Sequence, residues 1–270
     1  MYTIGKREIN QYLKLGRISI KRYFGQNYLL SQDKIRAFIN KLSEVENIIE
    51  IGPGFGNLTI NYLDRFKNSD ILKKVFLIEI DKESIDILKE NIELHVPKTY
   101  KQEIHIIQDD FLNIDFEKLN ITDEYAIIGA LPYNIGKRIV NIINERFLPP
   151  PKYCVFILQR EVVDKYLDEE SFLYKSSSLF ATLKREDILK KDCFFPIPNV
   201  DSRIIILKDF NTTDRVYLKK ITNFMRKAYK YPNKKLSNNI HETKNTELGE
   251  KRPKDITVKQ FISLYSSLDK

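Results

Sequence analysis

The stretch from Asn47 to Thr59, "NIIEIGPGFGNLT", constrains the fold more than any other part of the chain. Its β-branched run stops at glycines, which is typical of a buried strand that enters a tight turn, and a helix follows over residues 58–66. Gly52, Gly54 and Gly56 let the backbone approach a ligand, and the helix N-terminus offers free N–H groups. The stretch predicts either a ligand-binding turn or a tight strand-to-helix turn without a ligand.

Alternating strands and helices continue along the chain. We expect further strands at 75–81, 103–110, 126–128, 153–159 and 202–210, helices at 33–42, 82–94, 137–146 and 161–167, and a helix or strand near 177–184. Such alternation favours right-handed βαβ units and a parallel doubly wound sheet, which is an α/β fold.

The ends of the chain differ from this middle part. Residues 1–22 contain a short amphipathic helical pattern at Ile9, Tyr12 and Leu13 and form a basic N-terminal arm in our interpretation. From about residue 211 the pattern becomes helical and strongly basic. We therefore expect a central domain over 23–210 and a small all-helical domain over 211–270.

The net charge is +8, with 45 basic and 37 acidic residues. This balance favours a polyanionic partner such as nucleic acid, although a merely lysine-rich surface explains it equally well. Cys154 and Cys193 stand among apolar neighbours and are expected to be buried, reduced thiols of a cytoplasmic protein. Three scattered histidines predict no metal site, and no apolar run has the length of a membrane span.

Two carboxylates follow predicted strands at the edge where the glycine turn lies. Glu79 closes the second strand and can accept hydrogen bonds from both hydroxyls of a ribose. Asp110 ends the third strand, where it can accept from an adenine amino group or serve only as a turn acid. The glycine spacing differs from the dinucleotide G-x-G-x-x-G order, so a single nucleoside fits better.

The motifs occur in a recognisable order. "RYFGQNYLLSQ", "IIEIGPGFGNLT", "LIEID", "QDDF", "LPYNIG", "LQREVVDKYL" and "FFPIPNVDS" run from residue 23 to residue 202. The chain resembles the class I methyltransferases, and within them the KsgA-like rRNA adenine dimethyltransferases, which modify small-subunit rRNA. The erythromycin-resistance methyltransferases of large-subunit rRNA share several motifs, but "FGQNYL" and the "GPG" form fit the former better.

The resemblance implies a Rossmann-like methyltransferase sheet with a helical C-terminal domain, and S-adenosylmethionine as cofactor. The loop that carries Gln26, Asn27 and Leu29 would close over the methionine end of the cofactor. Further cofactor contacts fall on the glycine turn, the strand ends and the "ALPYN" turn, at Gly52, Gly54, Glu79, Asp110 and Ala130. Each position has a packing or turn role as its alternative.

The "ALPY" turn is the chemical centre that the resemblance implies. In families with this motif, a side-chain oxygen at the first position and the carbonyl of the second accept hydrogen bonds from the adenine amine. Here Leu131 supplies the carbonyl, Pro132 stiffens the turn and Tyr133 stacks on a flipped-out base. Ala130 stands where the family carries Asn, so one acceptor is missing and catalysis is expected to be impaired. Phe194 is a second candidate for stacking or a core aromatic.

Basic residues form the expected RNA contacts. The segment from Phe224 to Ile240 mixes cations with Tyr229 and Tyr231, a composition suited to phosphate contact and base stacking, or alternatively a solvated helix face. The candidate RNA-binding residues are Lys21, Arg22, Arg226, Lys227, Lys230, Lys234 and Lys235.

The leading expectation is a monomeric S-adenosylmethionine-dependent enzyme that dimethylates adenines of small-subunit rRNA during ribosome assembly, impaired at Ala130. One alternative is an RNA-binding assembly or transcription factor of the same fold that does not methylate. The other is a methyltransferase of large-subunit rRNA.

Overall fold

A computed structural model describes residues 2–147 and 149–268, apart from the side chain of Arg22. Its centre is a seven-stranded sheet with the strand order β4-β3-β2-β5-β6-β9-β7. The strands are β2 (Asn47–Ile51), β3 (Lys74–Glu79), β4 (Glu103–Gln108), β5 (Tyr125–Ala130), β6 (Tyr153–Gln159), β7 (Thr182–Leu189) and β9 (Ser202–Lys208). The expected strands are present, and their ends differ from the expected ranges by one or two residues in most cases.

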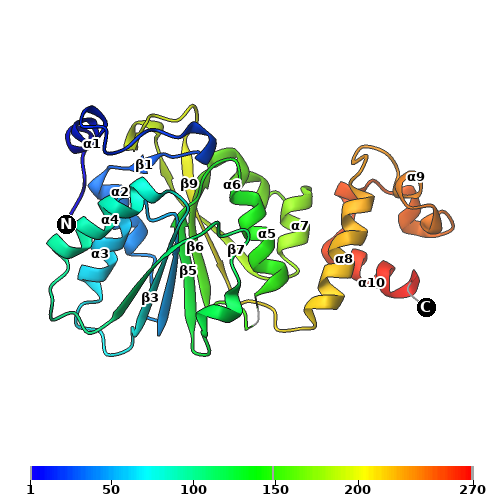
Figure 1. Cartoon of the computed structure of the whole chain (residues 1–270). Coiled ribbons are helices and arrows are strands. Elements are labelled where there is room, and N and C mark those ends of the chain that lie inside the picture. The colour runs from blue at the N-terminus through cyan, green and yellow to red at the C-terminus, as the bar shows by residue number, and fades with distance from the viewer. Residues whose placement is uncertain (1, 148, 269–270) are drawn as a thin grey trace.

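Helices cover both faces of the sheet (Figure 1). One face carries α2 (Gln32–Ile39), α3 (Asn57–Arg65) and α4 (Lys82–His95), and the other carries α5 (Gly136–Arg146), α6 (Arg160–Leu167) and α7 (Phe172–Ser177). Neighbouring strand residues enter opposite cores, as Ile48 and Ile49 of β2 do. This double burial explains why the strands are continuous apolar runs.

The prediction of an all-parallel sheet is wrong at one strand. β9 runs antiparallel to both of its neighbours, β6 and β7. The connection before β9, residues 190–201, contains a short turn (Lys191–Cys193) and a short strand (Phe194–Phe195) in place of a crossover helix, and the chain returns in the opposite direction. The ambiguous segment 177–184 divides between two elements, because α7 ends at Ser177 and β7 begins at Thr182.

The N-terminal segment forms a cover that packs against Phe55, after β2, and Ile87 of α4. It contains α1 (Lys6–Lys14), η1 (Arg22–Phe24) and β1 (Tyr28–Leu29), and β1 pairs antiparallel with β8 (Phe194–Phe195). Ile9 of α1 is fully buried in a small core that includes Phe55 and Ile87. The amphipathic pattern at the N-terminus thus forms a helix with a packed inner face.

The C-terminal part is helical, and its core also contains Leu179 and Phe180, which follow α7. It comprises α8 (Arg215–Ala228), α9 (Leu236–Asn239), α10 (Val258–Leu268) and the short turns η4 (His241–Thr243), η5 (Glu247–Glu250) and η6 (Pro253–Asp255). The turns η2 (Phe116–Leu119) and η3 (Lys191–Cys193) lie earlier in the chain. Lys175 of α7 joins the two parts, because its buried ammonium donates to the carbonyl oxygens of Lys254, at 3.0 Å, and Ile256, at 2.6 Å.

Across the described residues, no helix combines the length and the apolar character that crossing a membrane requires.

Candidate active site

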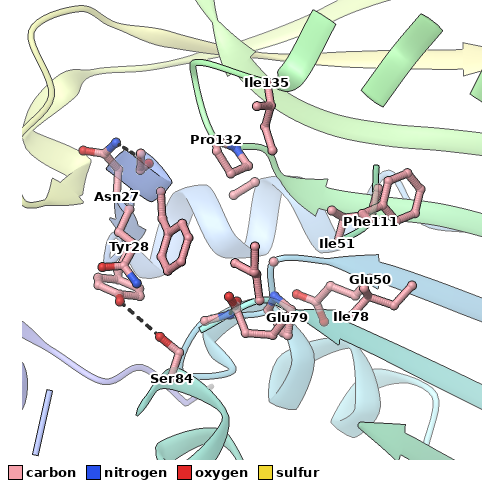
Figure 2. Close-up of a pocket in the computed structure, with 18 of the residues that line it drawn as sticks. Asn27, Tyr28, Glu50, Ile51, Ile78, Glu79, Ser84, Phe111, Pro132 and Ile135 are labelled. Atoms are coloured by element: carbon pink, nitrogen blue, oxygen red, sulfur yellow. Dashed lines mark hydrogen bonds between the residues drawn. The ribbon is translucent and has the colours of Figure 1, made fainter. Parts of the chain in front are cut away.

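A cavity of about 340 Å³ opens at the carboxyl ends of β2, β3 and β5. This volume falls in the usual range of ligand pockets, about 300–1,000 Å³. Figure 2 shows Asn27 and Tyr28 on one side of the cavity, Phe111 on the other, and Pro132 opposite Glu79. Parallel strands place these residues together because neighbouring strands end at the same edge of the sheet.

The glycine turn after β2 forms the floor of the cavity. Gly52, Gly54 and Gly56 all have positive φ, at 65°, 55° and 92°, which glycine adopts without the strain that a side chain would cause. A Cβ at Gly54 would lie 3.0 Å from the ring of Tyr28, whereas a Cβ at Gly52 would meet no protein atom within 4 Å. The turn therefore brings bare backbone to the edge of an open space, as a bound nucleoside cofactor requires.

Glu79 lies at the end of β3 and lines the cavity. Its Oε2 accepts from the N–H of Gly54, at 3.1 Å, and its Oε1 accepts from the N–H of Asp81, at 3.0 Å. Burial raises the pKa of this carboxyl, while the backbone bonds act in the opposite direction. Each carboxylate oxygen has a second lone pair, so Glu79 can also accept from the two hydroxyls of a ribose.

Glu50, in β2 two residues before the first glycine, is a pocket residue that the sequence reasoning missed. Its side chain is almost fully buried, and its Oε2 accepts from the hydroxyl of Thr59 at 2.6 Å. Burial raises its pKa to about 7. A carboxyl with such a pKa changes charge near neutrality, beside the glycine turn. It could have been noticed as the one acidic residue of the strand, set among three isoleucines.

Asp110 lines the opposite wall of the cavity together with Phe111. Its carboxylate accepts from the N–H of Leu112, at 2.9 Å, and from the amide of Asn113, at 3.3 Å. Asp110 thus serves as a turn acid in this structure and keeps lone pairs for an adenine amino group. Phe111 adds an apolar surface that suits the face of a flat ring.

The loop before β1 forms the side wall. Asn27 Nδ2 donates to the Gly25 carbonyl, at 3.0 Å, and Gln26 Nε2 donates to Asp81, at 2.8 Å. The ring of Tyr28 stacks on Phe55 of the glycine turn, with centroids 4.0 Å apart and planes 17° apart. This stack fixes the loop against the glycine turn.

The turn Ala130–Tyr133 forms the rim of the cavity. Ala130 and Pro132 line the cavity itself, while the side chain of Leu131 is buried behind it. The N–H of Leu131 donates to Ile157 at 3.0 Å, and the hydrogen bonds of the described residues include none to its carbonyl oxygen. The Tyr133 hydroxyl lies 2.6 Å from that of Ser202. The turn is therefore held by its neighbours while one carbonyl stays available.

Phe194 does not face the cavity in this structure. Its ring is 3 % exposed and belongs to the core between the sheet and α2, α3 and α4. Its neighbour Phe195 is half-buried at the surface end of β8. The arrangement matches the core interpretation of Phe194, so stacking by this residue stays a prediction that requires movement of β8.

The expected RNA-binding residues fall into two groups. Lys21 forms ion pairs with Asp81 and Glu83 beside the cavity, and the side chain of Arg22 lies outside the described part of the chain. In the C-terminal part, Arg226 pairs with Glu145 and Lys235 with Glu250. Lys230 and Lys234 lie over the exposed ring of Tyr231, at 5.5 and 4.7 Å from its centroid, and Lys227 is exposed nearby on α8.

All eight residues expected to contact the cofactor line this one cavity: Gln26, Asn27, Leu29, Gly52, Gly54, Glu79, Asp110 and Ala130. The sequence reasoning missed Tyr28, Glu50, Phe55, Phe111 and Arg138, which line it too. Tyr28, Glu50, Phe55 and Phe111 lie inside quoted motifs, whereas Arg138 lies two residues beyond "LPYNIG". Among the described residues, no three His, Cys, Asp or Glu side chains gather as metal ligands would.

The strand order, the antiparallel β9 and the cavity at the carboxyl edge define a class I methyltransferase fold. The positive-φ glycines and the open space above them fit S-adenosylmethionine, the methyl donor of this class. Comparison with solved structures gives the same fold. This protein superposes with a TM-score of 0.73 on a dimethyladenosine transferase from Plasmodium falciparum, at 18% identity over 89% of this chain and 97% of that one.

The 23S rRNA methyltransferase ErmE superposes with a TM-score of 0.63, at 20% identity over 90% of this chain and all of the other. The model of the ribosomal RNA adenine dimethylase family matches residues 17–269, and the chain belongs to that family. Ribosomal RNA small subunit methyltransferase A of Mycoplasma mobile is 32% identical over 82% of this chain and 83% of its own. The protein of that name from Mycoplasmopsis synoviae is 31% identical over 92% of this chain and 97% of its own.

Proposed function

We propose that this chain transfers methyl groups from S-adenosylmethionine to the exocyclic amines of adenines in small-subunit rRNA during ribosome assembly, at a rate limited by Ala130. The observation that carries the proposal is the placement of Ala130 and Pro132 on the rim of the cavity that all eight expected cofactor residues line. The family match and the relatives named for the small subunit support the substrate.

The bound cofactor would supply a methyl group on a positively charged sulfur. The protein has to hold the adenine amine in line with that group and accept hydrogen bonds from its N–H groups, so that the nitrogen lone pair turns towards the carbon. The Leu131 carbonyl is available for one of these bonds. Tyr133, the residue proposed to stack on the base, is held by its hydroxyl contact with Ser202 and does not itself line the cavity. Ala130 has no acceptor for the second bond.

The loss of one acceptor has a predictable size. A missing hydrogen bond to a group whose charge changes in the transition state costs on the order of 10²–10³ in rate. The remainder of the turn is in place, so both cofactor and base can still bind. The intact remainder of the turn supports an enzyme with a reduced rate more than it supports a protein that no longer binds cofactor or base.

The test compares Ala130→Asn with Ala130→Leu. The leucine side chain is similar in size to that of asparagine but has no hydrogen-bond acceptor. We expect the Asn variant to raise methyl transfer to immature small subunits by about 10²-fold or more, and the Leu variant to give no gain. Calorimetry with S-adenosylmethionine is expected to show binding by the wild type and the Asn variant.

Two outcomes would favour the other functions. An Asn variant that binds the cofactor and transfers no methyl to rRNA of either subunit would favour a non-methylating RNA-binding factor. The lack of a hydrogen-bond acceptor at Ala130 also suits such a factor. Transfer to large-subunit rRNA alone would favour the erythromycin-resistance type of activity. The likeness to ErmE is one of fold only. The relatives with the higher sequence identity are named for the small subunit, so the proposed substrate is small-subunit rRNA.

A further inference from the structure

Helix α1 has two faces of opposite character. Ile9 is fully buried, and Tyr12 and Leu13 pack beside it on the core around Phe55. The outer face carries Lys6, Arg7, Asn10, Gln11 and Lys14, which together line a shallow surface hollow of about 550 Å³. These residues recur every three to four positions, and the face they form is about 12 Å long at 1.5 Å per residue.

The cations on this outer face are unpaired. Within the part of the chain that the structure describes, no carboxylate lies within ion-pair distance of Lys6, Arg7 or Lys14. The one acid of the helix, Glu8, is engaged elsewhere, because its carboxylate accepts from the N–H of Gly5 at 3.0 Å. By contrast, Arg17 just after the helix pairs with Glu90.

Helix α1 lies beside the candidate active site. The helix packs on Phe55, and Phe55 stacks on Tyr28 in the wall of the cavity. Lys6 Nζ lies 5.9 Å from the ring centroid of Phe195, the residue that leads into the loop 196–201. Figure 1 shows α1 above β1, at the same end of the sheet as that loop. An RNA strand whose base enters the cavity would therefore pass close to this helix.

We propose that the outer face of α1 binds the phosphate backbone of the RNA substrate next to the target adenine. The inference rests on the proposed function and adds a contact surface apart from the C-terminal cations. Unpaired cations with interspersed amides suit phosphate oxygens, and such contacts position a nucleic acid without reading its sequence. The inner face is already buried in the protein, so the helix has no free apolar face to insert into a membrane.

The experiment reverses the three charges in the full-length chain, with Lys6→Glu, Arg7→Glu and Lys14→Glu combined. A matched control combines Lys98→Glu, Lys101→Glu and Lys118→Glu, three exposed lysines in the connections that lead into the opposite end of the sheet. Both variants lose the same formal charge. Binding of small-subunit rRNA is measured by filter retention from about 50 to 200 mM salt, and binding of S-adenosylmethionine by calorimetry.

We expect the α1 variant to bind rRNA at least about tenfold more weakly than the control at the lowest salt, with a salt slope smaller by about 2, as three lost single-strand phosphate contacts predict. Both variants are expected to bind the cofactor like the wild type. Equal rRNA affinity and slope in the two variants would overturn this inference alone. A wild type that binds no small-subunit rRNA would overturn the proposed function as well, and binding of the wild type to anionic vesicles without any rRNA effect would replace RNA by a lipid surface.

Discussion

The hydroxyl of Tyr133 lies 2.6 Å from the hydroxyl of Ser202, which is 69 positions later in the chain. Ser202 is fully buried and begins β9, the one antiparallel strand of the sheet. The ring that would stack on the target base is therefore held by the strand that distinguishes this fold from a wholly parallel sheet. This contact makes Ser202 a positioning residue for Tyr133.

Ser202→Ala is expected to weaken methyl transfer to rRNA while the protein stays folded. The lost hydrogen bond costs about 1 kcal/mol of folding free energy, whereas a loosened ring reduces the fraction of bases held in the reactive position. We predict a higher KM for rRNA in the Ala130→Asn background, with unchanged S-adenosylmethionine affinity. Tyr133→Phe, which removes the same bond from the other side, is expected to match it. If Tyr133→Phe keeps full activity, the bond has no positioning role.

Glu50 makes the stability of the protein depend on pH. Burial raises its pKa to about 7, against an ordinary value of 4.5. Between these two values the folded state keeps a proton that the unfolded state has lost, so a rise in pH favours unfolding. Glu50 should therefore stabilise the fold less and less from about pH 4.5 to about pH 7, and contribute no further change above that range.

The measurement is urea unfolding of the wild type and of Glu50→Gln at several pH values. The difference in free energy of unfolding, wild type minus variant, is expected to fall across this window and then to level off. A difference that is independent of pH would show that Glu50 ionises in the folded protein as it does in water.

The glycine turn offers a matched pair of substitutions. Gly54→Ala and Gly52→Ala both place a side chain at positive φ, which costs roughly 1–2 kcal/mol. At Gly54 the new Cβ would also lie 3.0 Å from the Tyr28 ring and push the stack with Phe55 apart, whereas at Gly52 it meets no protein atom. We expect both variants to lose cofactor affinity in calorimetry, and Gly54→Ala to melt at the lower temperature. Equal melting temperatures would show that Tyr28 gives way without cost.

Lys175 is expected to hold the C-terminal helices against α7. Lys175→Met keeps the aliphatic chain but leaves the carbonyl oxygens of Lys254 and Ile256 without their donor, at a cost of about 1–3 kcal/mol for each buried group left unpaired. Hydrogen exchange of α10 should accelerate in this variant while the central strands stay protected. Lys118→Met, at an exposed lysine, serves as the control. Uniform acceleration across the sheet would mean that the two parts unfold together.

The sheet and much of the cavity could be predicted from the sequence because their signals are local. A β-branched run that stops at glycines, and carboxylates such as Glu79 that follow strands, mark the carboxyl edge of the sheet without knowledge of the neighbours. The direction of β9 could not be predicted in this way, because its apolar run looks the same in either orientation. The direction follows from the connection before it, residues 190–201, which forms no α-helix.

The details of the site depend on contacts between distant segments. Lys21, which is expected to bind RNA, pairs with Asp81 and Glu83, which follow β3 some 60 positions later. The stack of Tyr28 on Phe55 arises because the N-terminal cover folds back on the glycine turn. Neither contact has a periodicity or spacing in the sequence, so only the folded chain shows them.

The two-residue ladder of β1 and β8 joins the wall of the cavity to the loop 196–201, through Tyr28 opposite Phe195 and Leu29 opposite Phe194. On the proposed function, a cofactor that orders β1 would also order β8 and the loop after it. By reciprocity, cofactor and RNA would then strengthen each other's binding by the same factor, whichever of them arrives first. Four residues would thus be enough to make methyl donor and acceptor cooperative.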